Sequence, residues 1–224
     1  MIIFKDVNKL FSNKKKALDD INFTIEDGEF VFLVGPSGAG KTTILRLIFR
    51  EILPTSGSII VSDIEVNKIK KNQIPFLRRR IGYIFQDFKI LPERTVSENV
   101  SIALEILGAK KDEIEIKVAD ILETVGLKGK ENYFPAQLSL GEQQRVAIGR
   151  AVIGNTDIIL ADEPTGNLDP KTSWDILRLL VKINKAGKTI VMATHNLDIV
   201  TSMKKRVIHI ENGKVVKSSL DKLY

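Results

Sequence analysis

The chain has no cysteine and only two histidines, His195 and His209, among its 224 residues. Disulfide bonds, thiolate catalysis and cysteine-ligated zinc are therefore excluded, and a histidine-rich metal site is not expected. No apolar run approaches the roughly 18 residues of a membrane-spanning helix. The first residues, MIIFKDV, lack the basic and apolar segments of a secretory signal. We therefore expect neither secretion nor a membrane span in this chain.

The composition that remains is typical of a folded domain, with 43% hydrophobic and 28% charged residues. The length suits one large domain or a core with a subdomain, at roughly 150 residues per domain. The net charge of +6 is mildly basic and suits phosphate ligands, an acidic membrane surface or nucleic acid. Two basic clusters, residues 78–80 and 204–206, are either solvated faces or contacts to an acidic inner leaflet.

The hydrophobic pattern predicts an α/β fold. Continuous apolar runs at residues 30–34, 158–161 and 190–193 are typical of strands buried on both faces of a parallel sheet. Residues 172–183 have helical spacing between the last two runs, which makes a strand–helix–strand unit. Residues 21–25 alternate as a strand, and the end of the chain predicts a hairpin turning at Asn212 and Gly213. The pattern from residue 97 to about 154 is helical almost throughout, which indicates a helical subdomain.

Residues 35–42 read GPSGAGKT and fit the phosphate-loop pattern GxxxxGK[ST] between a buried strand and a helix. Glycines let backbone N–H groups close around phosphate oxygens, and the helix N-terminus adds its dipole. We expect Lys41 to reach the β- and γ-phosphates and the Thr42 hydroxyl to ligate Mg²⁺. The expected ATP-binding residues of this segment are Gly35, Pro36, Ser37, Gly38, Ala39, Gly40, Lys41, Thr42 and Thr43.

An acidic pair follows the apolar run at residues 158–161. Asp162 and Glu163 would lie at the carboxyl edge of the sheet, where open α/β sheets bind ligands. We expect Asp162 to hold Mg²⁺ through water and Glu163 to polarise an attacking water.

From residue 138 the chain reads LSLGEQQRVAIGRA, which resembles the LSGGQ or LSGGE signature of the ATP-binding cassette (ABC) ATPases. Gln86 matches the family's Q-loop glutamine, residues 166–169 (GNLD) match its D-loop, and His195 matches its switch histidine. Phe11 stands where the family places the aromatic that stacks on adenine. The resemblance covers essentially the whole chain. It implies a P-loop NTPase (RecA-like) core at about residues 1–86 and 156–224, an antiparallel β subdomain, and a helical signature subdomain at about residues 87–155. Together these form one nucleotide-binding domain of residues 1–224.

The resemblance also implies a mechanism with ATP and Mg²⁺. Two copies are expected to dimerise head to tail around two ATP molecules. The implied catalytic residues are Glu163, His195 and Gln86, and the implied metal residues are Thr42, Gln86 and Asp162. The residues expected to reach the partner's ATP are Ser139, Gly141, Glu142 and Asp169. Taken singly, Ser139 also fits a helix N-cap, and His195 and Phe11 also fit structural roles.

Two positions depart from the family pattern. Leu140 replaces the first glycine of the signature and either crowds the partner's nucleotide or points away from it, in which case only Gly141 must be small. Gly149 replaces the usual alanine in the following helix, where glycine costs about 1 kcal/mol relative to alanine. Neither change touches Lys41 or the acidic pair, so we still expect hydrolysis.

Within the family, the interval between Gln86 and Ser139 is too short for an inserted coiled coil, and only one cassette is present. The segments FQDF (85–88) and TVSENV (95–100) resemble the cassettes of bacterial cell division. That resemblance implies a polytopic membrane partner whose conformational change activates peptidoglycan hydrolases, with this chain peripheral at the cytoplasmic face of the membrane. The apolar candidates for partner docking are Phe88, Ile90, Leu91 and Val96, although packing within the subdomain is the alternative for them.

Two alternatives remain. Residues 161–170 and 192–196 are shared with the cassettes of lipoprotein release and macrolide efflux, so an exporter ATPase is the first alternative. A soluble DNA-associated ATPase is suggested only by the basic balance. No aromatic residues interleave the basic clusters, so we expect no nucleic-acid partner.

Overall fold

The computed structural model describes residues 1–12 and 16–219. It divides the chain into two compact units, Met1–Arg78 with Gly187–Tyr224, and Arg79–Ala186. No helix in the described part of the chain is both long and apolar enough to cross a membrane.

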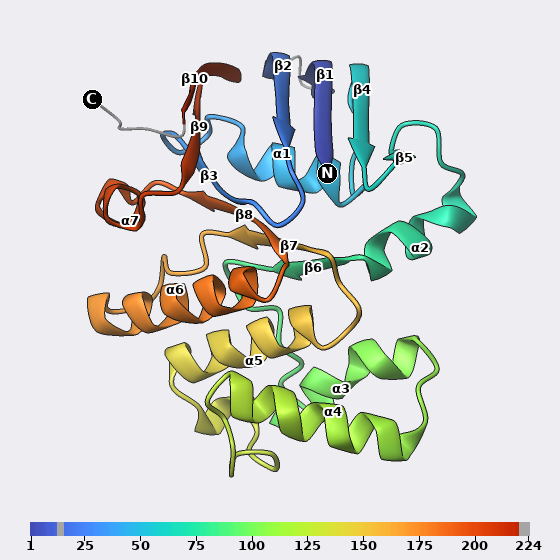
Figure 1. Ribbon diagram of the computed structural model, residues 1–224, viewed down its shortest axis with the longest axis vertical. Coiled ribbons are helices and arrows are strands. Elements are labelled where there is room, and N and C mark those ends of the chain that lie inside the picture. The colour runs from blue at the N-terminus through green and yellow to red at the C-terminus, as the bar shows by residue number, and fades with distance from the viewer. Residues whose placement is uncertain (13–15, 220–224) are drawn as a thin grey trace. The chain divides into compact units, whose positions relative to one another are not determined.

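The first unit contains an antiparallel sheet with the strand order β2-β1-β4-β5 (Figure 1). Its strands are β1 (Ile2–Leu10), β2 (Lys16–Ile25), β4 (Ser56–Val61) and β5 (Ile64–Glu65). Every second residue from Ile21 to Ile25 of β2 is buried, as a sheet with one covered face requires, and the rings of Phe4 and Phe23 stack with centroids 4.5 Å apart. This sheet is the expected antiparallel β subdomain.

The same unit contains the strand that leads into the phosphate loop. β3 (Phe30–Val34) is fully buried and pairs in parallel with both β8 (Thr189–Thr194) and β9 (Arg206–Glu211). β10 (Lys214–Ser219) returns antiparallel to β9, and the turn residues Asn212 and Gly213 have φ of 49° and 77°. Both left-handed values fit a two-residue hairpin, so the predicted hairpin is confirmed. The helical elements around these strands are α1 (Lys41–Ile48), η1 (Lys71–Gln73), α2 (Ile74–Arg79) and α7 (Leu197–Met203).

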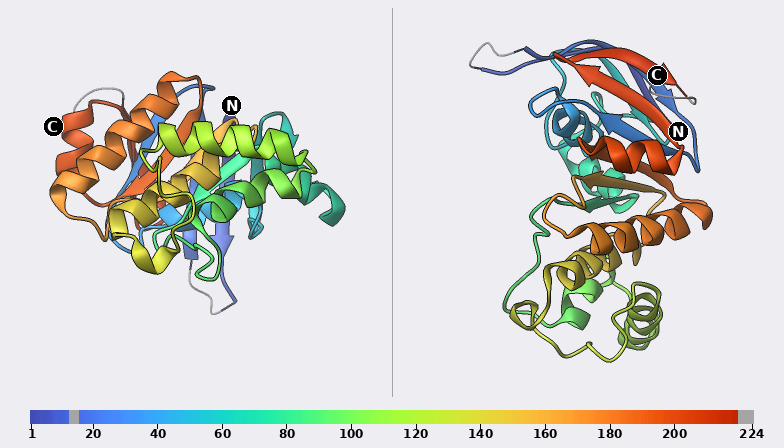
Figure 2. Two further views of the ribbon diagram at one scale, coloured as in Figure 1. Left: turned by 90° about the horizontal axis from the view of Figure 1, so that it is seen from below. Right: turned by 90° about the vertical axis from the view of Figure 1, so that its left-hand side faces the viewer.

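The second unit is mainly helical. Its strands β6 (Ile81–Ile84) and β7 (Ile158–Asp162) pair in parallel. Its helical elements are α3 (Val96–Ile106), α4 (Lys111–Thr124), η2 (Pro135–Gln137), α5 (Leu140–Val152) and α6 (Pro170–Lys185). Helices α3, α4 and α5 pack against one another (Figure 2). The backbone of α5 also lies directly on β6, because a Cβ at Gly82 would come within 2.1 Å of the Ala151 carbonyl oxygen.

The structure corrects one expectation and confirms another. Residues 97 to about 154 were expected to be helical almost throughout, but between the end of α4 at Thr124 and the start of α5 at Leu140 the only helical element is the short η2. Gly126 and Gly129, which follow α4, have left-handed φ values of 75° and 84°. The helix expected at residues 172–183 is confirmed as α6, which begins after the N-cap Asp169 with Pro170 at its first position.

Candidate functional site

Two glycines of the phosphate loop are required by close backbone approach. A Cβ at Gly35 would lie 2.0 Å from the carbonyl oxygen of Ile210, and one at Gly40 would lie 2.7 Å from the Leu18 side chain. Gly38 has open space around it, but its φ of 79° favours glycine. The C-terminal hairpin thus packs against this loop at Gly35, where a side chain would displace it, and β2 packs against the loop at Gly40.

The front of the loop offers backbone donors and a buried ammonium group. Gly40 is the N-cap of α1 and supplies no side chain to cap the first turn of the helix. Lys41 is buried, and its Nζ donates hydrogen bonds to the carbonyl oxygens of Gly35 (2.7 Å) and Pro36 (3.1 Å). A helix N-terminus that no side chain caps, beside a lysine, is a site for an anion such as a phosphate group.

A small cavity of about 170 Å³ brings Phe11 to this loop. Phe11 is half-buried, and the Nζ of Lys9 lies 5.2 Å from its ring centroid. The structure therefore places the aromatic residue expected to stack on adenine next to the residues expected to bind phosphate. The cavity is lined by Phe11, Ala17, Gly38, Gly40, Lys41, Thr42 and Thr43.

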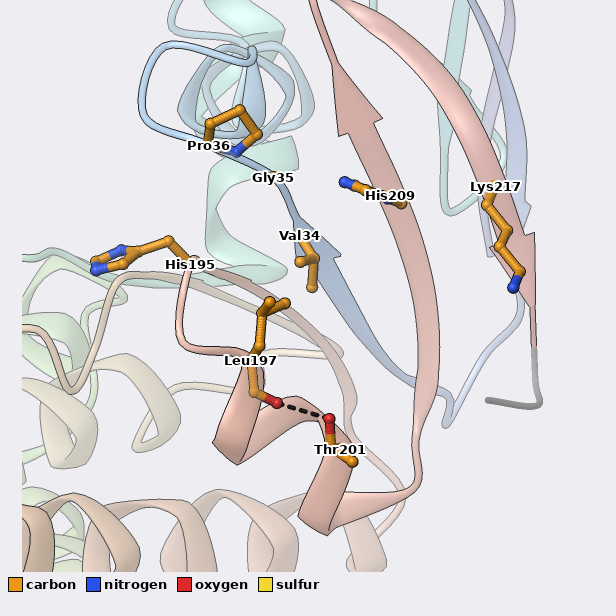
Figure 3. Close-up of a pocket in the computed structure, with 8 residues that line it drawn as sticks. All are labelled: Val34, Gly35, Pro36, His195, Leu197, Thr201, His209 and Lys217. Atoms are coloured by element: carbon orange, nitrogen blue, oxygen red, sulfur yellow. Dashed lines mark hydrogen bonds between the residues drawn. The ribbon is translucent and has the colours of Figure 1, made fainter. Parts of the chain in front are cut away.

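A second pocket, of about 510 Å³, is lined in part by Gly35 and Pro36 at the start of the same loop (Figure 3). His195 directly follows the end of β8 and lines this pocket, and its ring is directed away from that of His209 on β9. The predicted switch histidine thus lies beside Gly35 and Pro36 of the phosphate loop. The pocket is lined by Val34, Gly35, Pro36, His195, Leu197, Thr201, His209 and Lys217.

The acidic pair lies at the end of β7 in the second unit. Asp162 is the last residue of the strand and is only 9% exposed. Glu163 is half-buried and has a left-handed φ of 48°, a conformation that costs a non-glycine residue about 1–2 kcal/mol. The Gly166 N–H donates to the Glu163 carbonyl oxygen at 3.0 Å and helps to hold this turn. Strained residues of this kind cluster at functional sites.

The Q-loop, residues 86–91, follows β6 in the same unit. Gln86 is exposed, and its carbonyl oxygen accepts a hydrogen bond from the Asn167 side chain of the D-loop at 3.4 Å. Phe88, Ile90 and Leu91 are half-buried, so each presents part of its apolar surface. Val96, the fourth docking candidate, is completely buried and packs in the core instead.

Two residues that hold the Q-loop were missed in the sequence. Asn99 is completely buried, accepts from the Leu91 N–H (2.8 Å) and donates to the Leu91 carbonyl oxygen (3.0 Å). Arg150 donates to the carbonyl oxygens of Phe88 and Lys89. The available signals were a polar Asn99 one turn after Val96 on the apolar face of a helix, and an arginine within the apolar segment VAIGRAV.

The signature segment, residues 138–142, forms the start of α5. The Ser139 hydroxyl accepts from the Glu142 N–H (3.3 Å), and the Glu142 carboxylate accepts from the Ser139 N–H (2.9 Å), which makes a capping box. Lys130 also pairs with Glu142, and this ion pair, followed by the Ser139 backbone, lowers the pKa of the Glu142 carboxyl group. The capping role of Ser139 is therefore present in the structure, as its lone sequence signal allowed.

Two residues of the signature segment, Gly141 and Leu140, have different surroundings. Gly141 is buried, and a Cβ there would lie 2.4 Å from Cγ2 of Thr172 on α6. This glycine is thus required for the packing of α5 against α6 within one chain. Leu140 has a 51% exposed side chain, so no core packing explains its size.

The last D-loop residue, Asp169, is exposed and caps α6. Its carboxylate accepts from the Thr172 N–H at 3.0 Å. Hydrogen bonds from the Thr172 side chain and backbone lower the pKa of the Asp169 carboxyl group.

Each unit thus contains some of the residues of the predicted site. The first brings Phe11, the phosphate loop and His195 together. The second holds Gln86 next to the D-loop and places Asp162 and Glu163 in succession at a strand end. No group of three or more His, Cys, Asp or Glu residues that could hold a metal occurs within residues 1–12 and 16–219. The hydroxyl of Thr42 and the carboxylate of Asp162 are oxygen donors of the kind that Mg²⁺ uses together with substrate phosphates.

Comparison with known proteins defines the class. Residues 18–166 match the ABC transporter family, and the chain belongs to this family. The fold is similar over the full length of both chains to the dimeric structure of a bacterial ABC transporter cassette, with a TM-score of 0.90 and 37% identity. A dimeric post-hydrolysis cassette bound to ADP and Pi is similar with a TM-score of 0.89 and 36% identity, also over both full chains. The predicted fold class is confirmed.

Within the ABC transporter family, the chain is similar to cell-division proteins. The chain is 53% identical to the cell division ATP-binding protein FtsE of Bacillus subtilis over 217 residues, which cover 97% of this chain and 95% of that protein. It is 50% identical to FtsE of Mycobacterium tuberculosis over 225 residues, 100% of this chain and 98% of that protein. FtsE of Escherichia coli is 45% identical over 213 residues, 95% and 96% of the two chains. The predicted resemblance to the cell-division cassettes is confirmed.

Proposed function

We propose that this chain is the ATP-hydrolysing subunit of a bacterial cell-division complex and works with the membrane protein FtsX. The observation that carries this proposal is the identity of 53% with an FtsE protein along nearly the whole of both chains. The phosphate loop and the acidic pair described above supply the chemistry that an ABC ATPase needs. The chain is a single nucleotide-binding domain with a helical subdomain at about residues 87–155.

Different residues bind the adenine, the phosphates and the metal ion of ATP. Phe11 stacks on the adenine, while Lys41 and the backbone N–H groups of the loop hold the β- and γ-phosphates. Lys41 exchanges its hydrogen bonds with loop carbonyls for bonds to phosphate when ATP enters. Bound Mg²⁺ neutralises phosphate charge, and Thr42 and Asp162 are the residues that would hold it.

The remaining catalytic residues act on water and the γ-phosphate. Glu163 polarises the attacking water, and its left-handed backbone sets the direction in which its side chain leaves the chain. Gln86 orients that water and would be a further ligand of Mg²⁺, and His195 donates a hydrogen bond to the γ-phosphate. Two chains close around two ATP molecules, and Ser139, Gly141, Glu142 and Asp169 of each face the nucleotide of the other.

The partner surface is the Q-loop. Phe88, Ile90 and Leu91 are half-buried and present apolar surface that a short helix of FtsX could cover. Closure of the ATP dimer then changes the conformation of FtsX, which activates peptidoglycan hydrolases across the membrane. The chain is peripheral at the cytoplasmic face of the membrane through this contact.

The basic clusters contribute less to membrane contact than their charge suggests. Arg78 donates to the carbonyl oxygens of Phe49 and Arg50, and Arg206 pairs with Glu29. Arg80 pairs with Asp157. These three arginines are used within the fold. The candidates for contact with acidic lipids are therefore the exposed Arg79 and the lysines of residues 204–206.

The docking surface is tested by capture of FtsX. We expect Phe88→Asp and Leu91→Asp to abolish co-purification with FtsX from membranes while ATP binding is retained. Aspartate tolerates the left-handed φ of 59° at residue 88 better than most residues, so the first variant should fold. Ile116→Asp is the matched control, because Ile116 is 65% exposed on α4 and lies outside the Q-loop. Unchanged FtsX capture by both Q-loop variants would refute the surface. Capture of a lipoprotein-release subunit in place of FtsX would refute the partner.

A further inference from the structure

The Q-loop is held at three points by side chains of its own unit. Asn167 of the D-loop binds the carbonyl oxygen of residue 86, Arg150 of α5 binds those of residues 88 and 89, and Asn99 of α3 binds both backbone groups of residue 91. Of these three, only Arg150 comes from the helix that begins at the signature segment.

The guanidinium group of Arg150 makes two hydrogen bonds to the Q-loop backbone. Nη1 donates to the Lys89 carbonyl oxygen at 2.6 Å, and Nη2 donates to the Phe88 carbonyl oxygen at 2.8 Å. Burial of the guanidinium group lowers its pKa, although an arginine stays charged in proteins. A planar fork of two N–H donors fits two successive carbonyl oxygens, whereas the single ammonium group of a lysine does not.

The backbone that Arg150 holds is one that side chains disfavour. Phe88 and Lys89 have φ values of 59° and 48°, which are left-handed at two successive non-glycine residues. Such a conformation persists only where the surroundings impose it. The local backbone bonds of this turn, from the N–H of Phe88 to Phe85 and from that of Lys89 to Asp87, leave the two carbonyl oxygens to Arg150. The shape of the Q-loop therefore depends on the position of α5.

We propose that Arg150 is a positioning residue that transmits movements of the signature helix α5 to the Q-loop of the same chain. This inference rests on the proposed function, in which α5 carries Ser139 to the partner's ATP and the Q-loop carries Gln86 and Phe88. A shift of α5 when Ser139 engages the partner's nucleotide moves the carbonyl oxygens of residues 88 and 89. The orientation of Gln86 and the FtsX docking surface then follow the state of the opposite ATP site.

The chain offers a matched control on the same helix. Arg145 donates from Nη1 to the Val125 carbonyl oxygen at 2.8 Å, at the end of α4. Arg145→Gln removes an arginine–carbonyl bond from α5, as Arg150→Gln does, but leaves the Q-loop bonds in place.

The test uses the full chain with FtsX and compares steady-state ATPase of wild type, Arg150→Gln, Arg150→Lys and Arg145→Gln. We expect Arg150→Gln to lower kcat about 10- to 100-fold, since small misplacements of catalytic groups have effects of that size. The KM for ATP should not change, because the phosphate loop is untouched. Arg150→Lys should recover part of the loss, and Arg145→Gln should keep the wild-type kcat.

Two further readouts separate positioning from simple loss of stability. In a Gln86→Ala background, Arg150→Gln should lower kcat little further, since residues that act through one another are not additive. Amide exchange of residues 86–91 should be faster in Arg150→Gln and Arg150→Lys but unchanged in Arg145→Gln. Three results would overturn the inference. They are equal losses of kcat in Arg150→Gln and Arg145→Gln, additive losses of kcat in Arg150→Gln and Gln86→Ala, or unchanged amide exchange of residues 86–91 in Arg150→Gln.

Lys41→Ala distinguishes failure of the inference from failure of the proposed function. If Lys41→Ala keeps the wild-type ATPase rate, the proposed site is wrong and the inference falls with it. If Lys41→Ala is inactive while Arg150→Gln behaves as Arg145→Gln does, only the inference is wrong. Should Arg150→Gln not fold, the kcat and exchange of Arg150→Lys decide.

Discussion

Leu140 occupies the first turn of α5 with 51% of its side chain exposed, directly after the N-cap Ser139. An exposed apolar side chain beside the residue expected to meet the partner's γ-phosphate adds bulk where two chains close. Because core packing does not require the Leu140 side chain, replacing it should change the rate of ATP turnover more than the stability of the fold.

We therefore expect Leu140→Gly to raise kcat for ATP several-fold with a small loss of stability, since glycine at a helix end costs at most about 1 kcal/mol. The measurement is steady-state ATPase at saturating ATP together with urea unfolding. Leu140→Ile keeps the bulk and should leave the rate unchanged. Equal rates for Leu140→Gly and wild type would mean that the side chain does not reach the nucleotide.

Gln144 is the second residue with an unexplained side chain. It is completely buried in α5, and neither its amide oxygen nor its amide nitrogen has a hydrogen-bond partner within the described residues. An unsatisfied buried polar group costs about 1–3 kcal/mol. An apolar side chain of similar length would avoid that cost.

We expect Gln144→Met to raise the free energy of unfolding by about 1–2 kcal/mol in urea titration. The neighbouring Gln143 provides a matched control, because its Nε2 donates to the carbonyl oxygens of Pro135 (3.1 Å) and Leu138 (3.2 Å). Gln143→Met should lower the free energy of unfolding. If Gln144→Met also destabilises the chain, a bound water or another partner satisfies the Gln144 amide.

At the scale of elements, the crossing of α5 and α6 is set by a single glycine. A Cβ at Gly141 would overlap Cγ2 of Thr172, at 2.4 Å. We expect Gly141→Ala to lower the free energy of unfolding by about 1–3 kcal/mol through overpacking. Thr172→Ser removes Cγ2 and should restore most of that stability in the double variant.

The double variant also separates two roles of Gly141. If its stability returns but ATPase activity does not, this glycine is needed at the nucleotide as well as in the packing. Additive destabilisation by Gly141→Ala and Thr172→Ser in chemical unfolding would contradict the contact.

Much of the fold followed from local patterns. The buried strands β3, β7 and β8 were predicted because parallel strands covered on both faces need unbroken apolar runs. The phosphate loop was predicted because its GxxxxGK[ST] pattern stands directly between a buried apolar run and a helical segment. These features depend on residues that are close in the sequence.

The tethering of the Q-loop could not be predicted in the same way. The bonds from Arg150 depend on the rotation of α5 about its axis and on left-handed backbone at Phe88 and Lys89. Neither of these two residues is a glycine or an asparagine, so the sequence does not indicate a left-handed conformation there. The reason for Gly141 was likewise hidden, because Thr172 lies on another helix. The break between α4 and α5 was not predicted, because the helical spacing on either side of it was extended across the interval.

For the whole molecule, the central prediction is dimerisation that depends on ATP. Glu163→Gln removes the carboxylate expected to polarise water but keeps the groups expected to bind ATP, so the closed state should accumulate. With ATP, light scattering should report twice the 25.0 kDa mass of the single chain. Adding Lys41→Ala to this variant should restore the monomer. A monomer that binds ATP fully in the Glu163→Gln variant would contradict the head-to-tail dimer.

The C-terminal hairpin has a further consequence for the whole molecule. The Gly213 N–H donates to the Ala39 carbonyl oxygen, the Asp19 N–H donates to the Gly213 carbonyl oxygen, and the backbone of Ile210 presses against Gly35. During translation, the phosphate loop emerges from the ribosome long before the strands that brace it. A nascent chain therefore carries its nucleotide motif without the support that shapes it. Affinity for ATP is among the last properties that the growing polypeptide acquires, so an incomplete chain released early should neither capture nucleotide nor compete for the membrane partner.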